Sequence, residues 1–187
     1  MNEKTQAVRD APRKRKKSAL TVHEITVFAM LGTLMYCSKL LMEWAPNIHL
    51  IAMFITAITV VYRAKALIPI YVFVLLAMLF GGFSPFMAPY LYVWTVLWGV
   101  VMLLPRRMKP APAAAVYIGV CTLHGLLFGV LYAPLYALLA HLTLEGMLAW
   151  IAAGFYFDIL HAAGNFAAGF LILPMIKLLL KLEKRKS

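Results

Sequence analysis

The chain has 187 residues, of which 64% are hydrophobic and only 13% are charged. This balance is far from that of a soluble protein and indicates an all-α integral membrane protein. The net charge of +11 does not indicate a nucleic-acid partner, because the basic residues form short clusters between long apolar runs.

The N-terminal 18 residues are polar and strongly basic and contain no apolar run that could drive a core. They are predicted to form a disordered cytoplasmic tail. The remainder, residues 19–187, is predicted to be a single transmembrane domain.

Six apolar segments follow the tail, each bounded by charged, proline-containing or glycine-containing stretches. They predict a bundle of six transmembrane helices over about 22–42, 48–62, 67–80, 90–104, 114–138 and 147–180. The last segment is longer than the roughly 20 residues that one crossing needs. It is expected to be either one long tilted helix or a short interfacial piece followed by a span from about Phe155.

The positive charges predict the orientation of these helices. Seventeen of the eighteen Lys and Arg residues, all but Lys39, fall in the two tails, the junctions after the second and fourth segments, or the end of the last helix. With six crossings all of these positions lie on one side, which the positive-inside rule makes cytoplasmic. Both termini are therefore expected in the cytoplasm.

Three polar residues in the last segment have the spacing of one helical face: Asp158, His161 and Asn165. An acid, an imidazole and an amide inside an apolar helix are costly unless they face partners, water or a ligand. Polar groups inside a membrane helix are interpreted by default as parts of a functional site. A structural network, in which they satisfy one another and neighbouring helices, remains an alternative.

Further polar and aromatic residues gather at the outer ends of the predicted helices. Lys39, Glu43, Asn47 and His49 lie near the first connection, and rings flank the fourth and fifth segments. Aromatic surfaces with a few orienting polar groups are typical of small-molecule pockets, although an interfacial aromatic belt would use the same ring types. His124 could instead bond a neighbouring backbone. The predicted substrate-binding residues are Lys39, Glu43, Asn47, His49, Trp94, His124, Tyr132, Asp158, His161 and Asn165.

Several catalytic signatures are missing from the sequence. It contains no phosphate-binding glycine loop, no His-Glu-x-x-His pair and no Gly-x-Ser-x-Gly elbow. A metal site built on Asp158 and His161, with His49 or His124 added, would need chance assembly from separate helices. The chain is expected not to be an enzyme, to use no metal or cofactor, and to depend on partners or an ion for any active transport.

The chain resembles the substrate-binding S component of an energy-coupling factor (ECF) vitamin transporter. The resemblance covers about residues 20–182 and includes the six short spans, the basic tail, the small residues Ala29, Gly32 and Thr33, and the stretch 157–166. It implies a multi-pass protein of a prokaryotic cell membrane that captures a small vitamin-like micronutrient from outside.

The resemblance also implies partners. These would be a transmembrane coupling subunit and two cytoplasmic ATPases, with the coupling surface on the first helix. There the family's Ala-x-x-x-Ala pattern corresponds to Ala29 and Thr33, so that the second alanine is replaced. The loop with Trp44, Pro46 and Asn47 is expected to act as a lid. Two alternatives stay open: a proton-coupled transporter in which Asp158 and His161 relay protons, and a membrane-embedded metal-dependent enzyme.

Overall fold

The computed structural model describes residues 20–106 and 108–184, and within them it contains helices and no strands. The predicted tail, residues 1–18, lies outside the described residues. The elements are α2 (Val22–Leu41), α3 (Ile51–Tyr62), the 3-10 helix η1 (Arg63–Ala66), α4 (Leu67–Gly81), α5 (Tyr90–Leu103), α6 (Pro110–Leu126), α7 (Phe128–Leu139), α8 (Leu144–Gly169) and α9 (Ile172–Lys184).

Local sequence signals explain where several helices begin. Thr21 and Glu24 form a reciprocal capping box at the start of α2. Thr143 caps α8 by accepting a hydrogen bond from the Gly146 N–H at 3.1 Å. Pro110 occupies the first turn of α6, where its missing N–H costs nothing.

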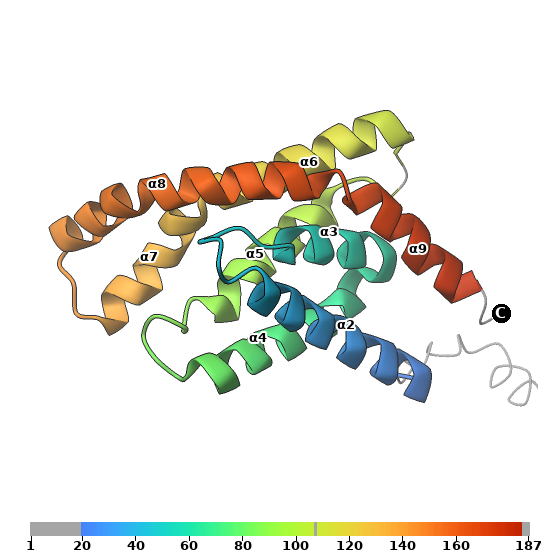
Figure 1. Cartoon of the computed structure of the whole chain (residues 1–187), viewed down its shortest axis with the longest axis horizontal. Helices are drawn as coiled ribbons and strands as arrows, with labels where there is room; N and C mark the ends of the chain where they lie inside the picture. Colours follow the sequence, from blue (N-terminus) through green and yellow to red (C-terminus); the bar gives the residue numbers. More distant parts are fainter. Residues whose placement is uncertain (1–19, 107, 185–187) are drawn as a thin grey trace, which may run out of the picture.

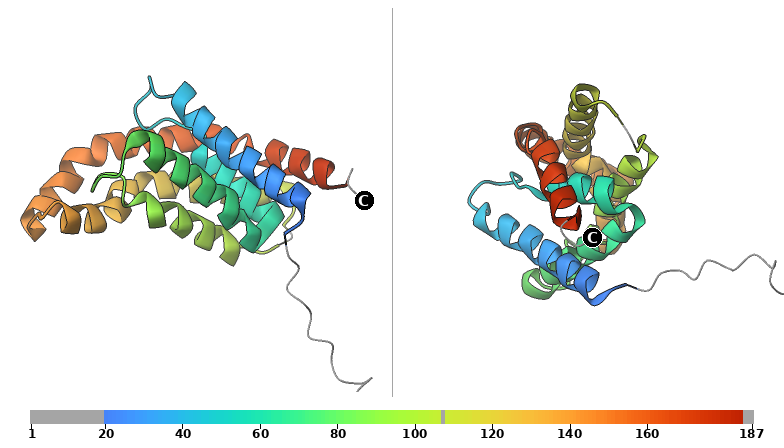
Figure 2. Two further views of the ribbon diagram at one scale, coloured as in Figure 1. Left: turned by 90° about the horizontal axis from the view of Figure 1, so that it is seen from below. Right: turned by 90° about the vertical axis from the view of Figure 1, so that its right-hand side faces the viewer.

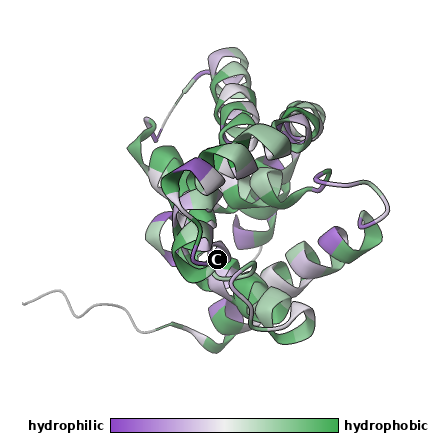
Figure 3. Cartoon of the chain, turned by 90° about the vertical axis from the view of Figure 1, so that its left-hand side faces the viewer, coloured by the Kyte–Doolittle hydropathy of each residue, from purple (hydrophilic) through white to green (hydrophobic). Residues whose placement is uncertain are grey.

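The expectation of an all-helical chain is confirmed for the described residues, and several helices have the length and composition of membrane spans. Four helical stretches of the described residues are long and apolar enough to cross a membrane, and α5 is apolar but shorter. Hydrophobic residues predominate along the helices (Figure 3), and many large apolar side chains face outward. The four stretches are Val22–Leu41, Ile51–Gly81, Pro110–Leu139 and Leu144–Gly169.

The stretch Ile51–Gly81 reverses direction in its middle. Arg63 has φ 55° and ψ −123°, which interrupts the helix, and α4 runs back against the direction of α3 (Figure 1). The turn is held by α5, because the Trp98 indole donates to the Arg63 carbonyl at 3.1 Å and the Arg63 guanidinium donates to the Met102 carbonyl at 2.6 Å. The predicted second and third segments are therefore separate helices.

The predicted fifth segment is broken at Leu127, which has φ −94° and ψ 6°. The N–H of Gly129, which a continuous helix would direct to the preceding turn, donates instead to the Asp158 carboxylate. Both sides of the break keep an inward-facing side, since Tyr117 and Cys121 before it and Tyr132 after it are buried.

Neither expectation for the last apolar segment is correct. Helix α8 is continuous through Phe155 and ends at Gly169, and α9 begins at Ile172. Pro174 explains the break, because it has no N–H to donate to the carbonyl four residues earlier and its ring crowds that carbonyl. The break therefore lies near the C-terminal end of the segment rather than near its start.

Helix α3 is the centre of the bundle. Its residues from Ile51 to Thr59 are all buried, and α2, α5, α6, α8 and α9 contact it. This burial explains how a helix of 12 residues is tolerated in a membrane-type bundle, since neighbouring helices rather than lipid surround its ends.

Close contacts between long helices depend on glycine. Helix α2 packs along α4 at Gly32, where an added Cβ would lie 2.6 Å from the Val72 side chain. Helix α6 packs along α8 at Gly125, where an added Cβ would lie 3.0 Å from the backbone N of Ala162.

The two ends of the bundle differ in charge. The start of α2 and the end of α9 lie at the same end of the molecule (Figures 1 and 2). The α3–α4 and α5–α6 connections lie there too, so this end carries all the described Lys and Arg residues except Lys39. The opposite end is formed by the α2–α3 connection, the α4–α5 connection and the α7–α8 hairpin.

Candidate functional site

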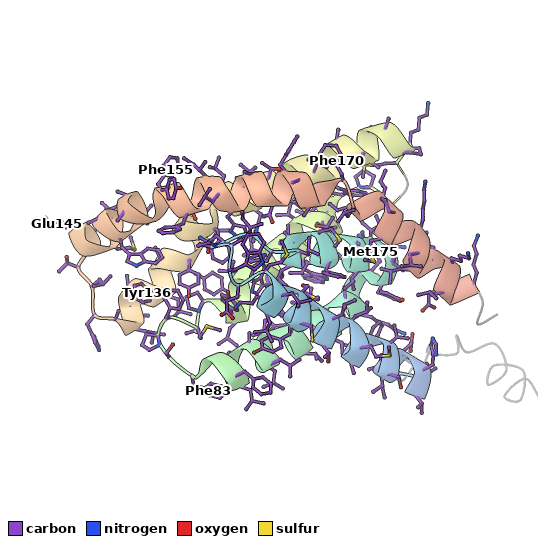
Figure 4. The ribbon with its side chains drawn as sticks, in the orientation of Figure 1. Phe83, Tyr136, Glu145, Phe155, Phe170 and Met175 are labelled. Carbon is purple, nitrogen blue, oxygen red and sulfur yellow. The ribbon has the colours of Figure 1, made fainter. Side chains whose placement is uncertain are left out.

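A cavity of about 560 Å³ lies at the end of the bundle opposite the basic residues. It is enclosed by the C-terminal end of α2, the connection 42–50, the start of α5, α7 and the middle of α8. Figure 4 shows side chains crowding this region, whereas Phe155 projects from the outer face of α8. The lining residues are Lys39, Met42, Glu43, Ala45, Pro46, Asn47, Ile48, His49, Phe86, Tyr90, Phe128, Gly129, Tyr132, Trp150, Ala153, Gly154, Phe157, Asp158 and His161.

The structure brings most of the predicted site residues together. Seven of the ten line this single cavity, although they come from four separate parts of the chain. These seven are Lys39, Glu43, Asn47, His49, Tyr132, Asp158 and His161.

The other three lie behind the cavity wall and hold helices together. Trp94 is fully buried, with its ring centroid 5.8 Å from that of His49. The His124 Nε2 donates to the Val93 carbonyl at 3.1 Å, which is the backbone contact that the sequence left open as an alternative. The Asn165 amide donates to the Cys121 carbonyl at 3.0 Å and so links α8 to α6.

The two carboxylate oxygens of Asp158 have different surroundings. Its Oδ1 accepts the backbone N–H of Gly129 at 3.0 Å, in the first turn of α7, where helical N–H groups have no partner within the helix. Its Oδ2 has no hydrogen-bond partner, and the side chain is only 4% exposed. One oxygen therefore caps α7, while the other is buried at the cavity wall without a partner.

His161 lies one turn after Asp158 and is 1% exposed. Neither of its ring nitrogens has a hydrogen-bond partner. Its ring makes edge contacts with His49 and Phe128, with centroid distances of 4.7 Å to each. A neutral imidazole offers one donor and one acceptor, so His161 can donate a hydrogen bond to a polar ligand group and accept another from it.

His49 closes the cavity from the connection between α2 and α3. Its Nδ1 is buried without a partner. Burial lowers the pKa of His49 to about 4, and the positive charge of Lys39 acts in the same direction. His49 is consequently a neutral group of the site at physiological pH.

The connection that is expected to act as a lid contacts the cavity with only some of its residues. Pro46 and Asn47 line the cavity, and Asn47 adopts a left-handed backbone conformation with φ 59° while its side chain reaches the Phe157 carbonyl at 3.4 Å. Trp44, in contrast, is 83% exposed and does not line the cavity. In this structure Trp44 therefore makes no contact with the cavity, and its lid role stays a prediction.

Lys39 and Glu43 supply opposite charges to the connection side of the cavity. They do not form an ion pair with each other: the ion pair found among the described residues joins Lys65 to Glu24. Glu43 is exposed and Lys39 is partly buried, so solvent screens both charges more than it screens Asp158.

Several aromatic lining residues were not predicted. Trp150 stacks on Tyr132 with ring centroids 5.8 Å apart and an interplanar angle of 11°. It lies eight residues before Asp158 on the same face of α8 and inside the predicted last segment, so helical periodicity was a signal that could have identified it. Phe86 lies in the α4–α5 connection, where no periodicity applies.

The three predicted partner-binding residues separate into two groups. Ala29 and Thr33 are exposed on α2. Gly32 is buried against Val72 of α4, so it serves contact within the chain and is not available to a second protein.

Within residues 20–106 and 108–184, no three His, Cys, Asp or Glu side chains come together in a way that could hold a metal ion. Comparison with protein-family models, curated proteins and solved structures finds no significant match for this chain.

Proposed function

We propose that the chain is the substrate-binding membrane subunit of an importer of the energy-coupling factor type. In this role it captures a small vitamin-like molecule from outside a prokaryotic cell and delivers it with the help of a membrane coupling subunit and two cytoplasmic ATPases. The observation that carries the proposal is the cavity, whose volume lies within the 300–1,000 Å³ range typical of small-molecule sites.

The lining of the cavity favours binding over a purely structural role. Buried atoms without partners gather at it from three parts of the chain: Nδ1 of His49, the Tyr132 hydroxyl, Oδ2 of Asp158 and both ring nitrogens of His161. Buried polar atoms in folded proteins are almost always paired. A ligand that supplied the missing hydrogen bonds would remove this cost, which gives the binding energy a physical source.

The position of the cavity favours uptake from outside. The described basic residues other than Lys39 lie at the opposite end of the bundle, and positive residues mark the cytoplasmic side of membrane proteins. In the proposed arrangement α6 with α7, and α8 with α9, each make one crossing, so that the chain crosses six times with both termini in the cytoplasm.

The floor of the cavity favours a binding subunit over a pore. Fully buried Trp94 lies beneath His49 and makes ring contacts with His124 and Phe128. Below it the core around α3 is closely packed. A ligand held above this floor reaches the other side only if the whole subunit changes its orientation or conformation, and such a cycle needs a bias between two states. The sequence has no nucleotide-binding loop, so the proposed ATPase partners would supply that bias.

Native mass spectrometry of the gently purified full chain tests the proposal. We expect a co-purified small molecule that is absent from a Gly154→Leu variant, because Gly154 lines the cavity and a leucine there occupies its space. Transport in cells should then require co-expressed coupling and ATPase subunits. Uptake that needs only a proton gradient would instead support the relay by Asp158 and His161. A chain that binds no small molecule in either form would overturn the proposal.

A further inference from the structure

We infer that the ligand of this cavity is an organic cation, with an apolar body of aromatic size and a positively charged nitrogen that lies against Asp158. The inference deepens the proposed function and depends on it, since it names the chemical class of the molecule that the cavity takes. It follows from the carboxylate, the rings around it and the distribution of charge along the cavity wall.

The carboxylate of Asp158 is the most deeply buried charged group of the cavity. It receives a single hydrogen bond, from the Gly129 N–H, and its second oxygen has no partner. No described Lys, Arg or His nitrogen lies within 4.0 Å of it. A buried carboxylate without a counter-charge is costly, whereas a ligand cation in contact with Oδ2 would convert this cost into binding energy.

The cavity wall around this carboxylate is aromatic. Phe128 adjoins Gly129, and Trp150 lies two turns before Asp158 on the same helical face. Tyr132 connects them, with ring centroids 5.5 Å from Phe128 and 5.8 Å from Trp150. Such rings attract cations through their negative faces, and boxes of this kind recognise quaternary ammonium groups. The aromatic lining residues are Phe86, Tyr90, Phe128, Tyr132, Trp150 and Phe157.

The remaining charged groups of the cavity do not oppose a preference for a cationic ligand. Lys39 and Glu43 carry opposite charges, and Glu43 is exposed to solvent. His49 is neutral at physiological pH because burial lowers its pKa to about 4. With neutral histidines the lining residues carry one formal positive and two formal negative charges, so an anionic ligand would lie against an uncompensated carboxylate.

A matched set of probes tests the inference on the purified full chain. Phenylethyl-trimethylammonium, 2-phenylethanol and 3-phenylpropanoate share the phenylethyl body and carry charges of +1, 0 and −1. Binding is measured from the tryptophan fluorescence, to which Trp150 in the cavity wall contributes. We expect the cation to bind at least tenfold more tightly than the neutral compound, and the anion to bind most weakly.

Two variants identify the origin of this preference. Asp158→Asn keeps an oxygen to accept the Gly129 N–H but removes the charge, and it should abolish the preference for the cation while the melting temperature stays close to that of the wild type. Glu145→Gln removes an exposed carboxylate at the start of α8, outside the cavity lining, and should leave the preference for the cation unchanged.

Three results would overturn the inference: equal binding of the neutral and cationic probes, as a protonated Asp158 would give; an undiminished preference in Asp158→Asn; or no binding of the cation at millimolar concentration. A neutral or anionic molecule that co-purifies with the wild type and is lost in Gly154→Leu would also overturn it. That last result would leave the proposed binding function standing, so the two proposals fail separately.

Discussion

The carboxylate of Asp158 on α8 accepts the backbone N–H of Gly129 at 3.0 Å and thereby caps the first turn of α7. The two residues lie in close contact, since a Cβ added to Gly129 would lie 3.2 Å from Asp158 Cγ and closer still to Oδ2. This contact joins the α6–α7 break to the polar face of α8. It also leaves Oδ2, which is buried against Gly129 beside the cavity, without a hydrogen-bond partner.

Replacing Gly129 by alanine should displace the Asp158 carboxylate. The added methyl group overlaps the position of Oδ2, so the side chain must turn away and lose its hydrogen bond to the α7 backbone. We expect ligand affinity to fall at least tenfold, as measured by titration of the purified protein. The helix itself tolerates alanine better than glycine, which limits the loss of stability. Unchanged affinity would show that the pose of Asp158 is unimportant for binding.

Gly154 offers a contrasting substitution on the same helix. An added Cβ meets nothing within 4 Å, so Gly154→Ala should raise the free energy of unfolding by up to about 1 kcal/mol through helix propensity. Gly154→Leu should keep that stability but project into the cavity and abolish ligand binding. Thermal unfolding and binding measured on both variants separate the two effects. A strongly destabilised alanine variant would contradict the open space seen beside this glycine.

His161 and Asn165 should respond differently to alanine although they lie on one face of α8. His161 makes no hydrogen bond in the protein, so His161→Ala should weaken ligand binding more than it lowers stability. Asn165 links α8 to the Cys121 carbonyl, so Asn165→Ala should cost about 1–3 kcal/mol of stability and affect the ligand less. Parallel melting and titration curves provide the comparison. If both variants lost ligand affinity and stability to the same extent, the two residues would belong to one structural network.

The titration of His49 should make stability depend on acidity. Its pKa is lowered from 6.5 to about 4 in the folded protein, so the unfolded chain binds more protons between these values. Stability should therefore fall as the pH decreases from about 6.5 towards 4, by up to about 3 kcal/mol from this residue. The groups that face the ring are Lys39, His124 and His161. His49→Asn should flatten the curve of melting temperature against pH in this window, and an unchanged curve would assign the dependence to the other histidines.

Two neighbouring positions on α2 separate folding from the proposed partner contact. Gly32 packs on Val72, so Gly32→Leu should force α2 away from α4 and destabilise the protein by several kcal/mol. Ala29 is exposed, so Ala29→Leu should leave the melting temperature unchanged but reduce co-purification with a co-expressed coupling subunit. Undiminished co-purification would place the partner surface elsewhere on the chain.

Periodicity and composition were sufficient to predict the helical, membrane-type chain and the common face of Asp158, His161 and Asn165. These features depend on hydrophobicity and on the 3.6-residue repeat, both of which are local. Helix breaks were predicted less well. The bend at Leu127 depends on a carboxylate from another helix, and the effect of Pro174 was hidden within a long apolar run.

The membrane character, the clustering of basic residues and the polar face of α8 were thus determined by the sequence itself, because each follows from the order of residues along one segment. Only the tertiary structure decided which polar groups line the cavity. Asn165 is covered by α6, whose Gly125 approaches α8 closely, whereas His161 faces the cavity beside α7. The difference between residues one turn apart arises from the path of a neighbouring helix, which no local pattern on α8 contains.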